Sequence, residues 1–302
     1  MQSPNTWGST WAIRIRDKKM AEQTETRITK MFDRLKAEGR GGLGTFITAG
    51  DPDYDTGLEI LMGLANAGAD MIEFGIPFSD PMADGPAIQA SSLRALKKGM
   101  NLKKTLDMVR KFRKQDDVTP IILMGYFNPI YIYGIDTFLS DAKEVGVDGY
   151  IVVDLPPEEE NELCKPAIAA GMNFIYLTAP TTDDKRLPRV VENASGFIYF
   201  VSITGITGTK SATSADIAPH LERIRKYTDL PIAVGFGIKT PKNAADTVKV
   251  GDAAIVGSAL VRVITDNLDE NDNPTPGIAT KVHKLVSELA AGVCSVNKKI
   301  GA

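Results

Sequence analysis

The sequence contains very few residues of the kinds that bind metals or act as nucleophiles. Its 302 residues include two histidines, His220 and His283, and two cysteines, Cys164 and Cys294. The histidines lie in separate polar stretches, and the cysteines are far apart, without the spacing of metal ligands. We therefore expect neither a metal site nor a histidine-based nucleophilic triad, which leaves carboxylates as the acid and base groups. The simplest interpretation of so little cysteine is a reduced, cytoplasmic chain, with a single disulfide as the alternative.

Long apolar runs and an excess of basic charge are also missing. No run approaches the roughly 18 apolar residues of a membrane helix. The net charge is -3 and the isoelectric point is about 5.6, so the chain lacks the basic surface typical of nucleic-acid-binding proteins. What remains is an ordinary globular composition, 43% hydrophobic and 24% charged, in a length that suits one α/β barrel of about 250 residues.

The two ends of the sequence differ from its middle. Residues 1–26 are polar, contain both tryptophans, Trp7 and Trp11, and show no sustained hydrophobic periodicity. They lack the apolar segment of a secretory signal, and we expect a disordered extension; a transit peptide or a start at Met20 are the alternatives. Residues 27–295 form the predicted barrel domain, and residues 296–302 form a short tail.

A repeated joint between helix and strand indicates the architecture. Four times, a helix-like stretch ends in a small or apolar residue and a glycine, and a short polar connector then leads into an apolar run. The glycines are Gly68, Gly146, Gly171 and Gly251. Glycine at this position allows the left-handed conformation that ends a helix, so each joint marks one repeating βα unit.

The pattern predicts an α/β fold, a single-domain (β/α)₈ TIM barrel with an extra N-terminal helix that runs from residue 27 to about residue 39. The predicted strands are 45–49, 70–75, 120–125, 149–153, 173–178, 197–201, 231–235 and 253–257. The predicted helices are 55–67, 87–97, 102–115, 136–145, 158–170, 183–193, 216–227, 241–249, 258–267 and 278–292. A doubly wound open sheet is the alternative, but the early glycine-rich turn of a dinucleotide-binding fold is missing.

The stretch 70–86 is the first candidate for chemistry. It places Glu73 near the end of a buried strand and Asp84 in the glycine- and proline-rich loop that follows. Active sites of such barrels lie at the carboxyl ends of the strands, where Asn128, Asp154 and Thr178 are also predicted. Two carboxylates in different environments can act as a buried acid/base and a solvated hydrogen-bond acceptor. In the alternative interpretation, Glu73 is ion-paired and Asp84 only shapes the turn.

Glycines after the last strands indicate a phosphate site. Gly235 and Gly237 follow the seventh predicted strand, and Gly257 and Ser258 follow the eighth and begin a helix. Barrels often bind phosphate here through backbone amides and a helix N-terminus, although tight packing explains glycine equally well. Gly208, after the sixth strand, belongs to the same set.

Two further features border this predicted site. The segment 202–216 is small, hydroxylated and glycine-rich, which is typical of a lid that excludes water but also of a plain linker. Aromatic residues near the strand ends form either the wall of a flat apolar ligand or part of the core. They are Phe46, Tyr126, Phe127, Tyr199 and Phe236.

Together these motifs resemble one known family, the α subunit of tryptophan synthase. The resemblance is carried by Glu-Phe-Gly-Ile-Pro-Phe-Ser-Asp-Pro-Met-Ala-Asp-Gly-Pro at 73–86, nearly residue for residue. Gly-Asp-Pro at 50–52, Met-Gly-Tyr-Phe-Asn-Pro at 124–129, Val-Val-Asp-Leu-Pro at 152–156, Gly-Ile-Thr-Gly at 205–208, Gly-Phe-Gly-Ile at 235–238 and Val-Gly-Ser at 256–258 agree in order and spacing. The resemblance extends over about residues 27–295.

The resemblance implies a retro-aldol lyase that cleaves indole-3-glycerol phosphate to indole and glyceraldehyde 3-phosphate in tryptophan biosynthesis. It implies that Glu73 shuttles the proton and that Asp84 accepts a hydrogen bond from the indole nitrogen. The other implied site residues are Phe46, Tyr126, Tyr199, Thr207 and Phe236 for the substrate, and Gly208, Gly237, Gly257 and Ser258 for the phosphate.

The resemblance also implies a partner. A tryptophan synthase β subunit would pack against residues 77–84 and 126–128 in an α2β2 complex and receive indole through a tunnel. The α chain itself would need no cofactor, because pyridoxal phosphate belongs to the β partner. One departure is Ile203, where several family members carry arginine, so a salt bridge made there is not expected.

Two other functions compete with this interpretation. One is a non-catalytic subunit that only activates a β chain. The other is a different phosphate-binding barrel, such as a ribulose-phosphate epimerase or an indole-glycerol-phosphate synthase. The epimerase usually needs metal-ligating histidines and the synthase needs lysines on its strands, and neither pattern is found in this sequence.

Overall fold

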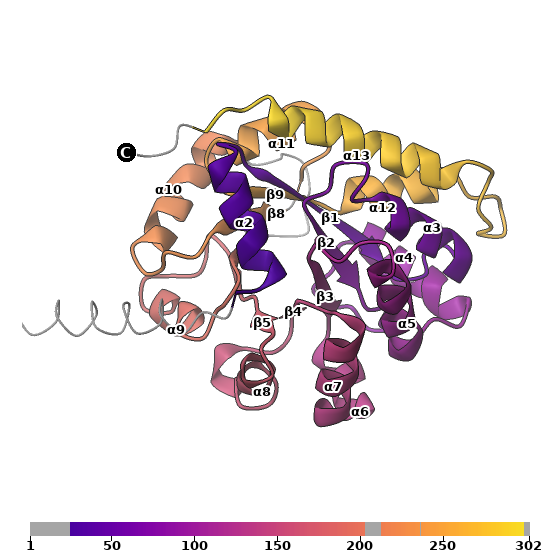
Figure 1. Cartoon of the computed structure of the whole chain (residues 1–302), viewed down its shortest axis with the longest axis horizontal. Coiled ribbons are helices and arrows are strands. Elements are labelled where there is room, and N and C mark those ends of the chain that lie inside the picture. Colours follow the sequence, from indigo (N-terminus) through magenta and orange to yellow (C-terminus); the bar gives the residue numbers. More distant parts are fainter. Residues whose placement is uncertain (1–24, 203–212, 236, 299–302) are drawn as a thin grey trace, which may run out of the picture.

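A parallel sheet forms the centre of the computed structural model, which describes residues 25–202, 213–235 and 237–298 (Figure 1). The strands are β1 (Gly42–Thr48), β2 (Met71–Gly75), β3 (Ile121–Gly125), β4 (Gly149–Val152), β5 (Asn173–Phe174), β6 (Leu177–Thr178), β7 (Ile198–Val201), β8 (Ile232–Gly235) and β9 (Ala253–Val256). Their order in the sheet is β5-β4-β3-β2-β1-β9-β8-β7-β6. All the pairings between them are parallel.

The two outermost strands of this order are halves of one predicted strand. β5 pairs with β4, and β6, which is separated from β5 by two residues, pairs with β7. Between them, Ile175 N–H donates to the Tyr150 carbonyl at 2.9 Å, and Tyr199 N–H donates to the Tyr176 carbonyl at 3.1 Å. The segment 173–178 therefore joins both edges of the sheet, and the predicted eight-stranded TIM barrel is confirmed.

Helices surround the sheet, and α13 lies across α11, α12 and α3 (Figure 1). They are α2 (Arg27–Ala37), α3 (Tyr54–Gly63), α4 (Pro86–Lys97), α5 (Leu102–Arg113), α6 (Phe127–Tyr133), α7 (Ile135–Val145), the 3₁₀ turn η1 (Pro157–Glu159), α8 (Cys164–Ala169), α9 (Leu187–Val191), α10 (Ser214–Arg225), α11 (Pro241–Val248), α12 (Ser258–Thr265) and α13 (Ile278–Cys294). In the part of the chain that the structure describes, no helix is both long and apolar enough to cross a membrane.

Two predicted helices are shorter than expected because each contains a proline. A continuous helix over 158–170 would place Pro166 in its interior, where the ring clashes with the carbonyl one turn earlier. The chain instead makes η1, breaks at Leu163 (φ -145°), and restarts with Pro166 in the first turn of α8. Pro188 likewise lies at the start of α9, so the predicted helix 183–193 is reduced to Leu187–Val191.

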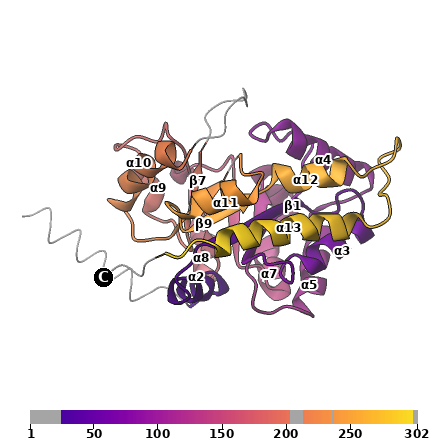
Figure 2. The ribbon, with the colours of Figure 1, turned by 90° about the horizontal axis from the view of Figure 1, so that it is seen from above.

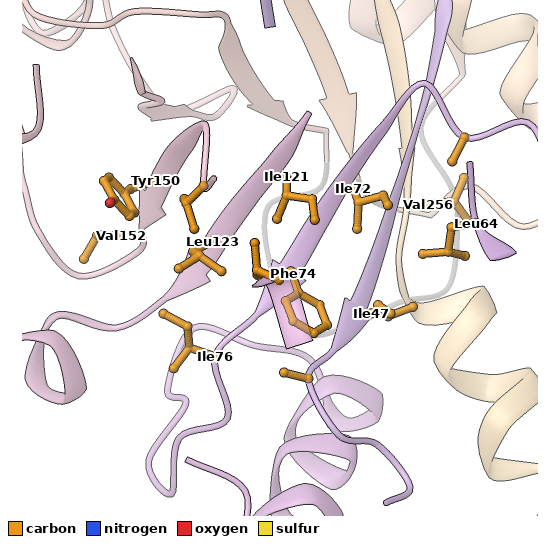
Figure 3. Packing of buried hydrophobic residues seen from close by; sticks show 14 of the residues in the cluster. Ile47, Leu64, Ile72, Phe74, Ile76, Ile121, Leu123, Tyr150, Val152 and Val256 are labelled. Carbon is orange, nitrogen blue, oxygen red and sulfur yellow. The ribbon is translucent and has the colours of Figure 1, made fainter. Parts of the chain in front are cut away.

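Side chains alternate between two cores. On β2, Ile72 and Phe74 point outward into the layer between strands and helices (Figure 3). Met71 points into the barrel, and Glu73, two residues further on, faces the same interior because successive strand residues point to opposite sides. This alternation aims the Glu73 carboxylate at the centre of the barrel.

At three of the four helix-to-strand joints, the aspartate that follows the glycine has a defined task. Asp148 accepts a hydrogen bond from Ile121 N–H of the neighbouring strand at 2.7 Å and pairs with Arg113 at 2.6 Å. Asp70 and Asp252 repeat the arrangement, each binding one strand amide and arginine side chains. These aspartates satisfy amides at the open ends of strands, so the joints fix the amino-terminal end of the barrel.

Helix α2 closes this amino-terminal end, on the side of the sheet opposite α4 (Figure 2). It begins at Thr26, whose side chain forms a capping box with Thr29. Arg27 pairs with Asp148 at 3.0 Å. The apolar face of α2 packs on the barrel interior, where the ring centroids of Phe32 and Phe197 lie 5.9 Å apart. The predicted N-terminal helix is confirmed, whereas residues 1–24 and 299–302 of the predicted extension and tail lie outside the described residues.

We expect Asp148→Asn to lower the free energy of unfolding by about 3 kcal/mol, because it leaves the buried Arg113 guanidinium without its counter-charge. Urea denaturation at neutral pH measures this change. The matched control is Glu144→Gln, because Glu144 is 71% exposed and pairs with Arg110 only at 3.5 Å. Equal stability of the two variants would contradict the role assigned to the joint aspartates.

Candidate active site

Glu73 lies near the carboxyl end of β2 and is completely buried. Neither of its carboxylate oxygens has a hydrogen-bond partner within the described residues. Burial therefore raises the pKa of Glu73 from 4.5 to about 8, because the charged form loses its hydration without compensation. Among the described residues Glu73 has no ion-pair partner, so this part of the structure does not support the alternative of a structural ion pair. This carboxyl group is protonated at neutral pH and can deliver a proton.

Tyr199 enters the same interior from β7. Its hydroxyl oxygen would lie 1.9 Å from a Cβ atom at position 235, so the ring needs glycine there. Burial, followed by the negative charge of Glu73 and Asp84, raises the pKa of Tyr199 well above its usual value. The phenol is therefore neutral, and it lies close enough to both carboxyl groups for their ionised forms to affect its pKa.

The carboxylate of Asp84 is held by Tyr126 and does not cap the helix that follows. The Tyr126 hydroxyl donates to the Asp84 carboxylate at 3.2 Å and accepts a bond from Ala83 N–H at 3.0 Å. The N-cap of α4 is Gly85, which has no side-chain cap, so the Asp84 carboxylate is not consumed in shaping the helix start. Burial raises the pKa of Asp84 to about 6, and the bond from Tyr126 opposes the rise. Asp84 is thus mostly ionised at neutral pH.

A small cavity of about 10 Å³ opens beside Asp84. Phe46, Thr48, Gly75, Ile76, Pro81, Asp84, Ile88, Ser92, Met124, Gly125, Tyr126 and Val153 line it. The predicted wall residues Phe46 and Tyr126 are both present. Gly75 allows the Phe46 ring to lie across the strand end, because a Cβ there would be 2.7 Å from the ring. Glu73 does not line this cavity and lies in the barrel interior beside it.

The predicted phosphate residues that the structure describes lie at two adjacent strand ends. β8 and β9 pair with Gly235 opposite Ile255, so Gly237 and Gly257 follow these strands at the same level. Gly237 has a φ of +81°, a value that favours glycine, and Ser258 begins α12. The predicted residues Thr207, Gly208 and Phe236, the departure at Ile203 and most of the predicted lid lie outside the described residues.

Other polar residues at the strand ends have structural partners. The Asp154 carboxylate accepts a bond from Phe127 N–H at 2.8 Å, and Thr178 donates to the Tyr199 carbonyl at 3.2 Å. Asn128 is exposed on α6. Within the described ranges no group of histidine, cysteine or acidic residues could hold a metal ion, and Cys164 and Cys294 do not form a disulfide.

The hydroxyl of Tyr126 is the functional group that sequence reasoning missed. We predicted Tyr126 as a flat wall for a ligand, yet its hydroxyl also holds the Asp84 carboxylate. The two residues are 42 positions apart, and only the adjacency of β2 and β3 brings them together. The site thus combines a protonated buried acid, an ionised carboxylate and adjacent strand-end amides.

Comparisons with known proteins agree on one family. A family model described as tryptophan synthase alpha chain matches residues 32–291. Tryptophan synthase subunit alpha from Legionella pneumophila str. Paris is 37% identical, with a TM-score of 0.82 over 90% of this chain and 100% of that one. A structure of tryptophan synthase from M. tuberculosis in an aminoacrylate-bound form is 30% identical, with a TM-score of 0.78 over 89% of this chain and 100% of that one.

The buried Glu73 makes stability depend on pH. Because its pKa is raised from 4.5 to about 8, the folded chain retains a proton that the unfolded chain releases. The stability that this retained proton gives the folded chain is fully present below the pKa of Glu73 in the unfolded chain. It is lost as the pH rises through the pKa of Glu73 in the folded chain. We expect Glu73→Gln to gain about 3 kcal/mol over the parent in free energy of unfolding between about pH 5.5 and about pH 8, measured by urea denaturation.

The matched control is Glu158→Gln. Glu158 is ion-paired with Arg186, and this bond lowers the pKa of Glu158 to about 2, below the measured range. Its substitution should leave the slope between those two pH values unchanged. A parent and a Glu73→Gln chain with the same pH dependence would show that Glu73 titrates normally.

Proposed function

Because the chain belongs to the tryptophan synthase alpha chain family, it is a lyase that cleaves indole-3-glycerol phosphate, and we propose that Glu73 and Asp84 perform this cleavage. The observation that carries the proposal is the contrast between the two carboxyl groups. Glu73 is buried with no hydrogen-bond partner among the described residues and has a pKa of about 8, whereas Asp84 is hydrogen-bonded to Tyr126 and has a pKa of about 6. Between these values one group carries a proton and the other a charge.

Glu73 supplies the proton that starts the reaction. It protonates C3 of the indole ring, which converts the ring to an indolenine with positive character at nitrogen. The resulting carboxylate then removes the proton of the adjacent glycerol hydroxyl. As the aldehyde forms, the carbon–carbon bond breaks and its electron pair returns to the ring. One proton leaves Glu73 and one returns, so the group is regenerated in each cycle.

Asp84 stabilises the charge that develops in the first step. Its ionised carboxylate accepts the ring N–H, whose positive character is greatest in the indolenine, so the interaction is stronger in the transition state than in the bound substrate. Tyr126 supports this role because its hydroxyl bond favours the ionised form of Asp84 and fixes its orientation. Phe46 and Tyr126 provide an apolar wall for the ring.

The phosphate group is assigned to the ends of β8 and β9. Gly237, Gly257 and the first turn of α12 at Ser258 present backbone amides there, and the positive end of the helix dipole favours an anion. Gly208 completes the proposed phosphate set. Tyr199, Thr207 and Phe236 complete the substrate set from the resemblance.

A β subunit is the proposed partner, in an α2β2 complex in the cytoplasm that passes indole between its sites. The support on this chain is a set of exposed apolar side chains in the segments that follow β2 and β3, namely Met82 (80% exposed), Tyr131 (62%) and Ile132 (75%). Exposed apolar groups gathered next to a binding site are typical of an interface. The cleavage proposed above uses only carboxyl groups of this chain, and pyridoxal phosphate is assigned to the β partner.

Cleavage should follow a bell-shaped pH profile. We expect kcat/KM to rise as Asp84 ionises near pH 6 and to fall as Glu73 loses its proton near pH 8. Release of glyceraldehyde 3-phosphate by the isolated chain measures the profile. Tyr126→Phe should move the acid limb upward, because the bond that it removes lowers the pKa of Asp84.

Two variants test which residue is responsible for each limb of this pH profile. Glu73→Gln should abolish measurable cleavage, and Asp84→Asn should lower it strongly while the affinity for glycerol 3-phosphate changes little. Cleavage at the parental rate by Glu73→Gln would refute the assignment to Glu73. Equal loss of cleavage and phosphate affinity in Asp84→Asn would indicate a collapsed loop.

The interface is tested by Met82→Asp. A charged group in an apolar contact should weaken binding of a tryptophan synthase β subunit by at least about tenfold, because the carboxylate would lose its hydration on docking. Titration calorimetry against the β subunit measures the affinity. Val118→Asp is the control, since Val118 is 75% exposed but lies at the amino-terminal end of the barrel. Equal affinities for Met82→Asp and the parent would exclude this surface.

A further inference from the structure

A buried ion pair joins two segments whose residues line the cavity beside Asp84. Arg94 on α4 donates to Asp51 through two parallel bonds, Nε to Oδ1 at 2.8 Å and Nη2 to Oδ2 at 2.9 Å. The side chains are 7% and 0% exposed. Burying two charges is expensive even when they are paired, so such a pair is weak support for stability alone. Its position relative to the cavity is what distinguishes it.

Each partner belongs to a segment that lines the cavity. α4 begins two residues after Asp84 and contributes Ile88 and Ser92 to the lining. Asp51 lies three residues beyond β1, whose end contributes Phe46 and Thr48.

One further bond connects α4 to β1, and another connects α4 to Asp84. The hydroxyls of Thr48 and Ser91 are 2.6 Å apart, which ties the end of β1 to α4 a second time. At the start of α4, the side-chain amide of Gln89 donates to the Asp84 carbonyl at 2.8 Å. A shift of α4 relative to β1 would therefore change the position of Asp84 relative to Phe46 and Tyr126.

We propose that Asp51 and Arg94 are positioning residues for Asp84, which clamp α4 against the end of β1 so that the Asp84 carboxylate stays within reach of the Tyr126 hydroxyl and the substrate ring. The inference rests on the proposed role of Asp84. A guanidinium and a carboxylate joined by two bonds fix distance and orientation together, which a lysine cannot do. A displacement of about 1 Å at a catalytic group is enough to lower a rate by about 100-fold.

Arg94→Lys tests the clamp because it keeps the charge and removes the second bond. We expect it to lower kcat for cleavage by about 10- to 100-fold, with a change in glycerol 3-phosphate affinity of less than about twofold. The Asp84 carboxyl, followed by carbon-13 NMR in the unliganded chain, should titrate at higher pH, because its bond from Tyr126 is lost. Thr48→Val should give a smaller change in the same direction without leaving a buried charge unpaired.

A matched control for Arg94→Lys lies at the opposite end of the barrel. Arg113 pairs with Asp148 at 2.6 Å, with side-chain exposures of 9% and 4%, but at the amino-terminal end of the barrel. Arg113→Lys should lower the melting temperature as Arg94→Lys does, while kcat and the Asp84 titration keep their parental values.

Three outcomes separate the hypotheses. An unchanged Asp84 titration in Arg94→Lys overturns the clamp, and so do equal effects of Arg94→Lys and Arg113→Lys on kcat. Full cleavage by Asp84→Asn instead overturns the proposed role of Asp84. The NMR titration does not depend on activity, so it still decides whether the clamp positions this carboxylate.

Discussion

The barrel must keep water away from one buried carboxyl group that has no hydrogen-bond partner among the described residues. Glu73 faces an interior of apolar side chains, and no described residue offers its oxygens a hydrogen bond. Such a group is tolerated because it remains protonated, and it remains protonated because water is excluded. The closure of the barrel along 173–178 and the packing of α2 over its amino-terminal end keep this interior dry. The fold thus maintains the proton that the chemistry needs.

Pairs of aspartate and arginine occur at both ends of the barrel, and their surroundings separate their roles. At the amino-terminal end, Asp148, Asp70 and Asp252 bind strand amides, and the first two also pair with arginines of α2, so their effect is on stability. At the carboxyl end, Asp51 and Arg94 connect α4 to the segment after β1 beside a cavity, and among the described residues their side chains bind no strand amide that would give them the same task. The same chemistry therefore serves the scaffold at one end and, in our proposal, the site at the other.

The barrel and Glu73 were predictable from the sequence because each depends on a local pattern. Repeated glycine joints gave the βα units, and a glutamate in an otherwise apolar strand indicated an unusual environment. Three features were not predictable. The helix is interrupted at Leu163 because Pro166 lies in the first turn of α8. A proline in the sequence can follow the end of one helix or lie in the first turn of another, and the sequence pattern does not distinguish the two. The Tyr126–Asp84 bond and the Asp51–Arg94 pair depend on contacts across 42 and 43 residues, and no periodicity encodes such contacts.

The junction between β5 and β6 is the place where the two edges of the sheet meet. Each of these strands has only two residues, whereas β1, on the far side of the barrel, has seven. Backbone bonds are therefore fewest where the fifth strand joins the two halves of the sheet. Local opening begins where the fewest bonds must break, so amides along 173–178 are the natural site of early hydrogen exchange. The barrel is therefore not a ring of equal strands. It consists of two half-barrels that pair extensively through β1 and β9 and are joined by far fewer backbone bonds along 173–178.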